Sequence, residues 1–215
     1  YALTLTTPNF SPKPSGLPRI PIAMSAVGPA MLRVAGQVAD GVLLHPFSTR
    51  RYLAEESLAR IGEGLERNSR ERHEIDVVSG AFIATGKDDE AVARMKEYIR
   101  FRISFYCSTR AYWNVLRLHG LEDLGEKLRP FPVAGRWSEM AAQIPDDIVE
   151  LFAVVGRHDE LASKIAQKYE GLADTLSLFV PTDTEPGPLG EVMQDIQRIP
   201  AKFTGYAQEP PRAAA

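Results

Sequence analysis

The stretch "IPIAMSAVGPAMLRVAGQVADGVLLHPF", residues 20–47, decides the fold. It opens with an apolar run over 20–25, which small residues and a Gly-Pro pair interrupt, and an amphipathic segment over 29–39 follows. A second apolar run at 42–44 comes directly after an Asp-Gly turn. A strand that passes through a short turn into a helix and then into another strand is typical of a parallel crossover unit. The stretch therefore predicts one such unit.

The same alternation continues along the chain. A helix is expected over 49–67, weakened by Gly62 and Gly64, and a buried strand over 74–86 with a bulge at Gly80. The later elements of the same pattern are a long helix over 89–108 capped by Asp88 or Asp89, a helix over 159–169 and a last strand over 175–180. The four expected strands are all short and apolar, as in a parallel sheet covered by helices.

The remaining segments set the domain organisation. Residues 1–19 are rich in proline and form an arm, because neither a helix nor a central strand tolerates so many prolines. Short helices at about 110–155 interrupt the alternation, and we interpret them as an insertion into a core that spans 20–181. The tail over 182–215 carries one short helix near 191–198 and is expected to be disordered after Ala207.

Composition excludes several classes of protein. The chain has 215 residues, of which 44% are hydrophobic and 25% charged, and its formal net charge is -3. These values fit a globular protein with one core and give no basic field for nucleic acid. No apolar run approaches the roughly 20 residues that span a bilayer, and no signal peptide is visible, so we expect a cytoplasmic protein. The single Cys107 and the four scattered histidines give no metal signature.

The order of these segments resembles the C-terminal part of the luciferase-like monooxygenase family. Besides the opening stretch, the resemblance rests on a "FIATG" strand before an acid-capped helix and on the closing "VVGRHDELASKIAQKYEGLADTLSLFVP", and it runs from about Thr6 to Pro181. The arm "LTLTTPNFSP" and the segment "FYCSTRAYWNVLRLHGLEDLG" resemble the actinobacterial branch that uses the deazaflavin coenzyme F420 rather than FMN.

The resemblance implies a fold and an assembly. Members of the family are (β/α)8 TIM barrels of the α/β class that carry helical insertions and usually pair as dimers. The chain would supply the C-terminal half, strands five to eight, and a full member has about four more β/α units on the N-terminal side. The chain begins with Tyr1 rather than Met, so we expect an upstream part that holds most of the substrate residues. From the residues alone, an open doubly wound sheet remains the alternative.

The "SAVGP" turn is the candidate cofactor site. A strand that ends in small residues and enters a helix at once presents free backbone N–H groups and the positive end of the helix dipole, which suits an anion. Ser25 by its hydroxyl, and Ala26, Val27 and Gly28 by their backbone, would line the phosphate of a flavin-like cofactor, as the resemblance implies, and Pro29 opens the helix. The alternative is a tight turn with a purely structural role.

His45 is the second candidate, because it follows the strand at 42–44. The C-terminal ends of barrel strands face the active site, so its imidazole could donate to a cofactor phosphate or to substrate. Packing under the Pro46-Phe47 turn is an equally weighted alternative. By geometry Thr85 is expected at the site end of its strand and Ser79 inside the barrel.

Other polar residues have structural interpretations. Three arginines could bind a polyanionic cofactor tail, but a solvated helix face is favoured for them: Arg100, Arg102 and Arg110. Three residues are interpreted as packing residues: Tyr106, Cys107 and Trp113. The remaining histidines have three contexts. His73 and His158 are expected in solvated polar loops or helix caps, and His119 at a helix end. The acidic pairs 122–123 and 146–147 fit helix N-termini better than a catalytic dyad.

The sequence therefore predicts a flavin- or deazaflavin-dependent oxidoreductase in which the cofactor carries the hydride chemistry. F420 is the expected cofactor and an unknown organic molecule the substrate, and no residue is assigned as catalytic acid or base. Two alternatives stay open. One is an FMN-dependent monooxygenase, and the other is a non-catalytic half-barrel that binds or assembles with a partner, because half a barrel exposes two sheet edges.

Overall fold

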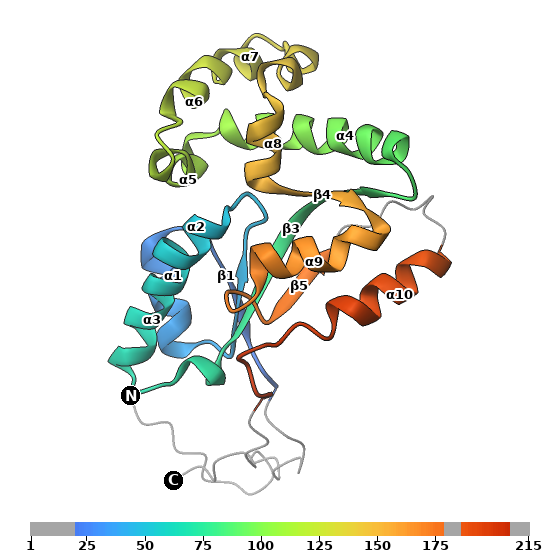
Figure 1. Ribbon diagram of the computed structural model, residues 1–215. Coiled ribbons are helices and arrows are strands. Elements are labelled where there is room, and N and C mark those ends of the chain that lie inside the picture. The colour runs from blue at the N-terminus through green and yellow to red at the C-terminus, as the bar shows by residue number, and fades with distance from the viewer. Residues whose placement is uncertain (1–19, 179–185, 207–215) are drawn as a thin grey trace, which may run out of the picture.

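Five parallel strands and the helices between them make up the part of the chain that the structure describes. The computed structural model describes residues 20–178 and 186–206. The strands are β1 (Ala23–Ala26), β2 (Gly41–Leu44), β3 (Asp76–Gly86), β4 (Ala153–Arg157) and β5 (Thr175–Leu178). The α-helices are α1 (Pro29–Val38), α2 (Arg50–Tyr52), α3 (Leu58–Arg67), α4 (Asp89–Cys107), α5 (Trp113–Leu118), α6 (Glu122–Leu128), α7 (Pro130–Val133), α8 (Asp146–Phe152), α9 (His158–Tyr169) and α10 (Pro186–Ile196) (Figure 1).

Shorter helical turns complete the connections. A π-helical turn at Leu53–Ser57 joins α2 to α3, so that 50–67 forms one continuous helical segment. Turns of 3-10 helix occupy Arg72–Glu74, Arg110–Tyr112, Trp137–Glu139 and Ala141–Gln143. No described helix is long and apolar enough to cross a membrane.

The strands form a parallel sheet in which β3 pairs with three other strands, β2 and β5 along its first half and β4 along its second half. β1 pairs with β2, and β2 pairs with β3 over its first residues, with Ser25 opposite Leu43 and Leu43 opposite Val78. β5 also pairs with β3, with Val78 opposite Thr175, whereas β4 pairs only with the second half of β3, from Phe82 to Gly86. The ladder β1-β2-β3-β5 is therefore a parallel wall to which β4 adds an extension.

The two faces of this wall differ in burial. Ala26, Leu44 and Ser79 are in register and almost fully buried on the face that α1, α3 and α9 cover. Ser25 and Leu43, which point the other way, are exposed, and Leu43 keeps 41% of its surface accessible. We call the side of Ser25, Leu43 and Val78 the open face.

A close helix contact supports the β1–α1–β2 unit. A Cβ atom at Gly64 in α3 would lie 2.9 Å from the carbonyl carbon of Arg33 in α1, and one at Gly36 would lie 3.1 Å from the Cα of Gly64. The two backbones thus touch without side chains between them. Gly64 has a packing role in the helix that the sequence predicts over 49–67, because it allows this helix to approach α1 closely.

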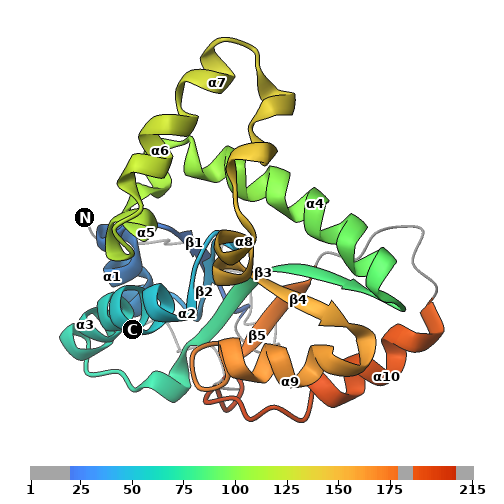
Figure 2. The same cartoon turned by 45° about the horizontal axis from the view of Figure 1, so that its top comes forward.

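A second core lies above the C-terminal ends of the strands. Helices α4–α8 surround it, and Figure 2 shows them rising beyond the tips of β2 and β3. Phe47 from the loop after β2 stacks on Phe152 from α8 at 4.3 Å between ring centroids. This aromatic pair anchors the inserted helices to the parallel wall.

The structure corrects four expectations about elements. β4 was not expected, because Ala153–Arg157 lies at the edge of the predicted insertion. No bulge occurs at Gly80, since the register with β5 runs through it without a break. A Cβ atom there would lie 2.8 Å from Cδ of Pro46, so glycine is needed for packing. β1 begins at Ala23 rather than Ile20, and α10 begins before the short helix predicted at 191–198. The predicted arm over 1–19 and the disorder after Ala207 lie outside the described residues.

Candidate functional site

Helix α1 begins directly after β1, and no side-chain hydrogen bond of the described residues caps its N-terminus. Gly28 is the N-cap of α1, and Pro29 occupies the first helical position. Within residues 20–178 and 186–206, no side-chain hydrogen bond caps the first-turn amides, and this turn contains no acidic residue. By contrast, Asp88 caps α4 through Ala91 N at 2.8 Å. The start of α1 therefore keeps backbone donors and a positive dipole end available for an anion.

Gly28 is not required by its backbone or by its described neighbours. Its φ of -89° and ψ of 158° are open to any residue. A Cβ atom at Gly28 would meet nothing within 4 Å among the described residues. The described residues thus leave the space over the turn open, and glycine there lets a ligand approach the backbone closely.

His45 lies beside this turn with a fixed tautomer. Its Nδ1 accepts a hydrogen bond from Phe47 N at 3.0 Å, so the proton of the neutral ring resides on Nε2. The ring packs against Tyr106 and Tyr112, each 4.6 Å away between centroids. Burial and the positive charge of Arg102 lower the pKa of His45 to about 4. Its Nε2–H is therefore a neutral hydrogen-bond donor at physiological pH.

A small cavity joins the turn to the histidine. Ala26, Val27 and His45 line it, and its volume is about 20 Å³, enough for one water molecule. Ser48 lines the same cavity, and its buried Oγ has no hydrogen-bond partner among the described residues. A buried hydroxyl without a partner is costly unless a water or ligand atom satisfies it.

The predicted site residues are thus brought together in part. Val27, Gly28 and His45 surround the start of α1, and Ala26 is buried with its side chain toward the helices, so that only its backbone can serve a ligand. The hydroxyl of Ser25 belongs to the open face rather than to the small cavity. The open face and the turn meet at the C-terminal end of β1.

A larger cavity on the open face involves residues that the sequence analysis did not select. It measures about 350 Å³ and is lined by Leu43, Val78, Gly80, Phe82, Ser177 and Arg102, among others. Arg102 reaches it from α4, and so does Ile99, three residues earlier on the same helix face. The spacing could have linked these two side chains, but the sequence does not indicate which way α4 crosses the strands.

Several expectations about single residues are wrong. Ser79 faces the helix-covered side, because it alternates with Val78 along β3, and its hydroxyl donates to Gly80 O. Arg100 is not solvated; it is buried and ion-paired with Glu97 and Asp146. His158, by contrast, lies in the predicted helix-cap context, at the first position of α9, and its Nδ1 is 3.2 Å from Thr85 Oγ1.

Other interpretations are confirmed by the packing. Cys107 is fully buried, and burial raises the pKa of its thiol to about 12. Trp113 is buried and donates from Nε1 to Cys107 O at 2.8 Å. His119 ends α5, where its Nε2 lies 2.8 Å from Thr49 Oγ1. The acidic pairs at 122–123 and 146–147 stand in the first turns of α6 and α8.

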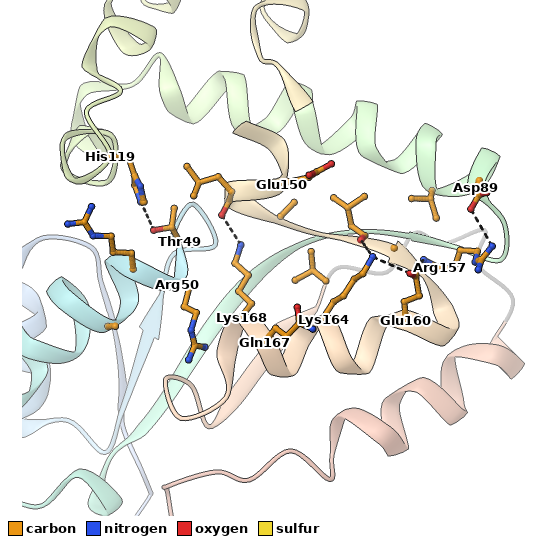
Figure 3. A pocket seen from close by; sticks show the side chains of 18 of the residues that line it. Thr49, Arg50, Asp89, His119, Glu150, Arg157, Glu160, Lys164, Gln167 and Lys168 are labelled. Atoms are coloured by element: carbon orange, nitrogen blue, oxygen red, sulfur yellow. Dashed lines mark hydrogen bonds and ion pairs between the residues drawn. The ribbon is translucent and has the colours of Figure 1, made fainter. Parts of the chain in front are cut away.

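A more voluminous cavity lies elsewhere. It measures about 940 Å³ and opens between the start of α2, β4 and α9 (Figure 3). Lys164 donates to Val155 O at 2.8 Å and lies 3.4 Å from Glu160, and Lys168 donates to Phe152 O. Burial lowers the pKa of Lys168 to about 7. This cavity holds none of the predicted cofactor residues, and its lysines fasten α9 to β4 and α8.

The chain is similar to known proteins in sequence. The family model described as luciferase-like monooxygenase matches residues 1–175. An uncharacterized protein of Mycobacterium tuberculosis is 37% identical over 199 residues, which cover 92% of this chain and 58% of that protein. The 5,10-methylenetetrahydromethanopterin reductase of Methanopyrus kandleri is 29% identical over 150 residues, which cover 69% of this chain and 41% of the reductase. The chain thus spans about half the length of its curated relatives, from 41% to 58% of the two named here.

Solved structures share the fold. The coenzyme F420 dependent tetrahydromethanopterin reductase from Methanopyrus kandleri matches with a TM-score of 0.61 at 23% identity, over 84% of this chain and 50% of that chain. An F420-dependent secondary alcohol dehydrogenase in complex with an F420-acetone adduct matches with a TM-score of 0.58 at 10% identity, over 83% of this chain and 49% of that chain. The predicted fold class is confirmed: an α/β chain with a parallel sheet that corresponds to about half of a TIM-barrel-like reductase.

Proposed function

Because the chain belongs to the luciferase-like monooxygenase family, we propose that it is part of an F420-dependent oxidoreductase that transfers hydride between F420 and an organic substrate. In this proposal the 215-residue chain supplies the cofactor phosphate site and one wall of the pocket for the cofactor ring. The missing portion of the barrel would supply the opposite wall. When bound, a deazaflavin supplies a two-electron hydride donor or acceptor.

One observation carries the proposal: the uncapped start of α1 with open space over Gly28. The turn leaves backbone N–H groups free, and the ten residues of α1 direct the positive end of their dipole to the same point. The open space over Gly28 and the unpaired hydroxyl of Ser48 are both consistent with a ligand at this end of the wall. The residues present therefore fit a phosphate group.

His45 would act as a positioning donor in this site. Because its Nδ1 is occupied by Phe47 N, its Nε2–H can donate to a phosphate oxygen or a carbonyl oxygen without carrying a charge. The rings of Tyr106 and Tyr112 pack against the imidazole and hold it in place. We assign no proton transfer to His45, since its low pKa makes it a poor acid reservoir at neutral pH.

F420 is preferred over FMN on the basis of the relatives. Both of the solved structures compared above are F420-dependent enzymes by their descriptions. The phosphate turn itself would suit either cofactor, so an FMN-dependent monooxygenase is the second candidate. We further propose a dimer in the cytoplasm, with residues 20–181 as the barrel half between an N-terminal arm and a C-terminal tail.

The proposed phosphate site can be tested by placing a negative charge at position 28. In the protein expressed from its complete reading frame, Gly28→Asp should weaken F420 binding at least tenfold by calorimetry, because a carboxylate would meet the cofactor phosphate. Gly62→Asp is the matched control, since Gly62 in α3 also has open space around it. Both variants should keep the wild-type melting temperature within a few degrees. Unchanged F420 affinity in a folded Gly28→Asp protein would show that the turn is only structural.

A further inference from the structure

The open-face cavity contains one cation, Arg102. Its walls are mainly apolar, from Leu43, Val78, Phe82 and Leu178, and Ser177 adds a hydroxyl. Arg102 enters this cavity from α4. A cavity with apolar walls and a single convergent charge is the usual form of a site for a small organic ligand.

Aromatic rings hold the Arg102 guanidinium in place. Its central carbon lies 5.7 Å from the ring centre of Phe82 and 5.9 Å from that of Tyr98. Nη1 donates to the Tyr98 hydroxyl at 3.4 Å. Arg102 also hydrogen-bonds the Tyr106 side chain. These contacts orient the guanidinium, and the rest of its five N–H donors have no partner among the described residues.

No carboxylate pairs with Arg102 among the described residues. Its neighbours on the same helix differ, because Arg100 is paired with Glu97 and Asp146 and Arg94 with Glu90. A planar guanidinium can donate two parallel hydrogen bonds to one carboxylate. Because Arg102 lies beside apolar walls, its environment fits the carboxylate of an apolar molecule.

The charge of Arg102 also reaches the site at the strand ends. It is one of the two causes that lower the pKa of His45, after burial. An anion bound to Arg102 would cancel part of this repulsion, so the titration of His45 reports on the occupancy of the cavity.

We propose that Arg102 binds the carboxylate of a small apolar substrate whose body fills the open-face cavity. This inference rests on the proposed function, because it names the substrate class of the same site. It places the substrate against β2, β3 and β5, beside the cofactor turn at β1. Arg102 is then a specificity-determining residue that selects carboxylates over neutral analogues.

Two other anions could occupy the same donors, and the probes separate them. One is an anionic group of the cofactor, and the other is a carboxylate of the protein outside the described residues. Benzoate serves as the apolar carboxylate, benzamide as its neutral counterpart and inorganic phosphate as the cofactor-like anion. Each probe is titrated into the protein expressed from its complete reading frame, with and without F420.

The expected result is selective binding of benzoate. Calorimetry should give at least tenfold tighter binding of benzoate than of benzamide in the wild type, with and without F420. The selectivity should vanish in Arg102→Gln and persist in Arg94→Gln, which changes an exposed arginine of the same helix. NMR should show the pKa of His45 rising when benzoate is added to the wild type.

Other outcomes overturn the inference. If benzoate and benzamide bind equally, or if neither raises the pKa of His45, Arg102 does not select a carboxylate, whether or not Arg102→Gln folds. If F420 prevents benzoate binding and Arg102→Gln loses F420, the arginine serves the cofactor. Failure of F420 to bind the wild type, with benzoate selectivity intact, contradicts the proposed function and leaves the carboxylate site standing.

Discussion

The contact between α1 and α3 gives a sharp test of the packing that supports the cofactor turn. Gly64→Ala would place a Cβ atom 2.9 Å from the carbonyl carbon of Arg33 and closer still to its oxygen. Both are backbone atoms of α1, so no side chain can swing away to make room. The helices must separate, and α1 carries the turn that starts at Gly28.

The magnitude follows from two opposing effects. Replacing glycine by alanine inside a helix stabilises it by roughly 0.5–1 kcal/mol, because the unfolded chain loses less freedom. Forcing extra volume into a packed contact costs about 1–3 kcal/mol. Gly62→Ala in the same helix meets nothing within 4 Å, so it keeps only the gain. We expect Gly64→Ala to be destabilising by about 1–2 kcal/mol net and Gly62→Ala to be stabilising.

Urea unfolding monitored by circular dichroism measures both variants against the wild type. The midpoint should fall for Gly64→Ala and rise for Gly62→Ala, with equal slopes. The opposite order of the two midpoints, or equal stabilisation by both, would refute the close backbone contact between α1 and α3.

Two further predictions concern burial. Burial lowers the pKa of Lys168 from 10.5 to about 7. Between pH 7 and about pH 10, the unfolded chain therefore keeps a proton on Lys168 that the folded chain has released. The free energy of unfolding should accordingly rise with pH over this range. Lys168→Met should remove this rise in urea titrations at pH 7 and 9; a rise that survives in the variant would contradict the assignment. Because Ile20 and Ile22 are 81% and 65% exposed beside the edge of β1, the 215-residue chain should self-associate or bind a hydrophobic dye. A monomer by light scattering without dye binding would contradict an open edge.

Local signals account for the elements that were predicted correctly. The Gly-Pro junction at 28–29 and the apolar spacing of the next ten residues locate α1, and Asp88 locates the start of α4. β4 was not predicted because its five residues lie directly between α8 and α9, without turn residues at either end. They form a strand because they pair with the distant residues 82–86. Such a contact leaves no local pattern in the sequence.

The parts of the candidate site that could be predicted are those set by the local chain path at the end of a strand. The turn at Gly28 and the position of His45 follow from consecutive residues. The orientation of Ser79 depends on the register between β2 and β3, and a shift of one residue reverses the face. The position of Arg102 depends on the path of α4 over Phe82, which nonlocal packing of the inserted helices determines.

The most direct test of the account is the choice of cofactor. Fluorescence quenching titrations of the protein expressed from its complete reading frame compare F420 with FMN under the same conditions. The account predicts that F420 binds at least tenfold more tightly, a difference of about 1.4 kcal/mol. Tighter binding of FMN, or rapid oxygen consumption with reduced FMN, would contradict it and favour the monooxygenase alternative.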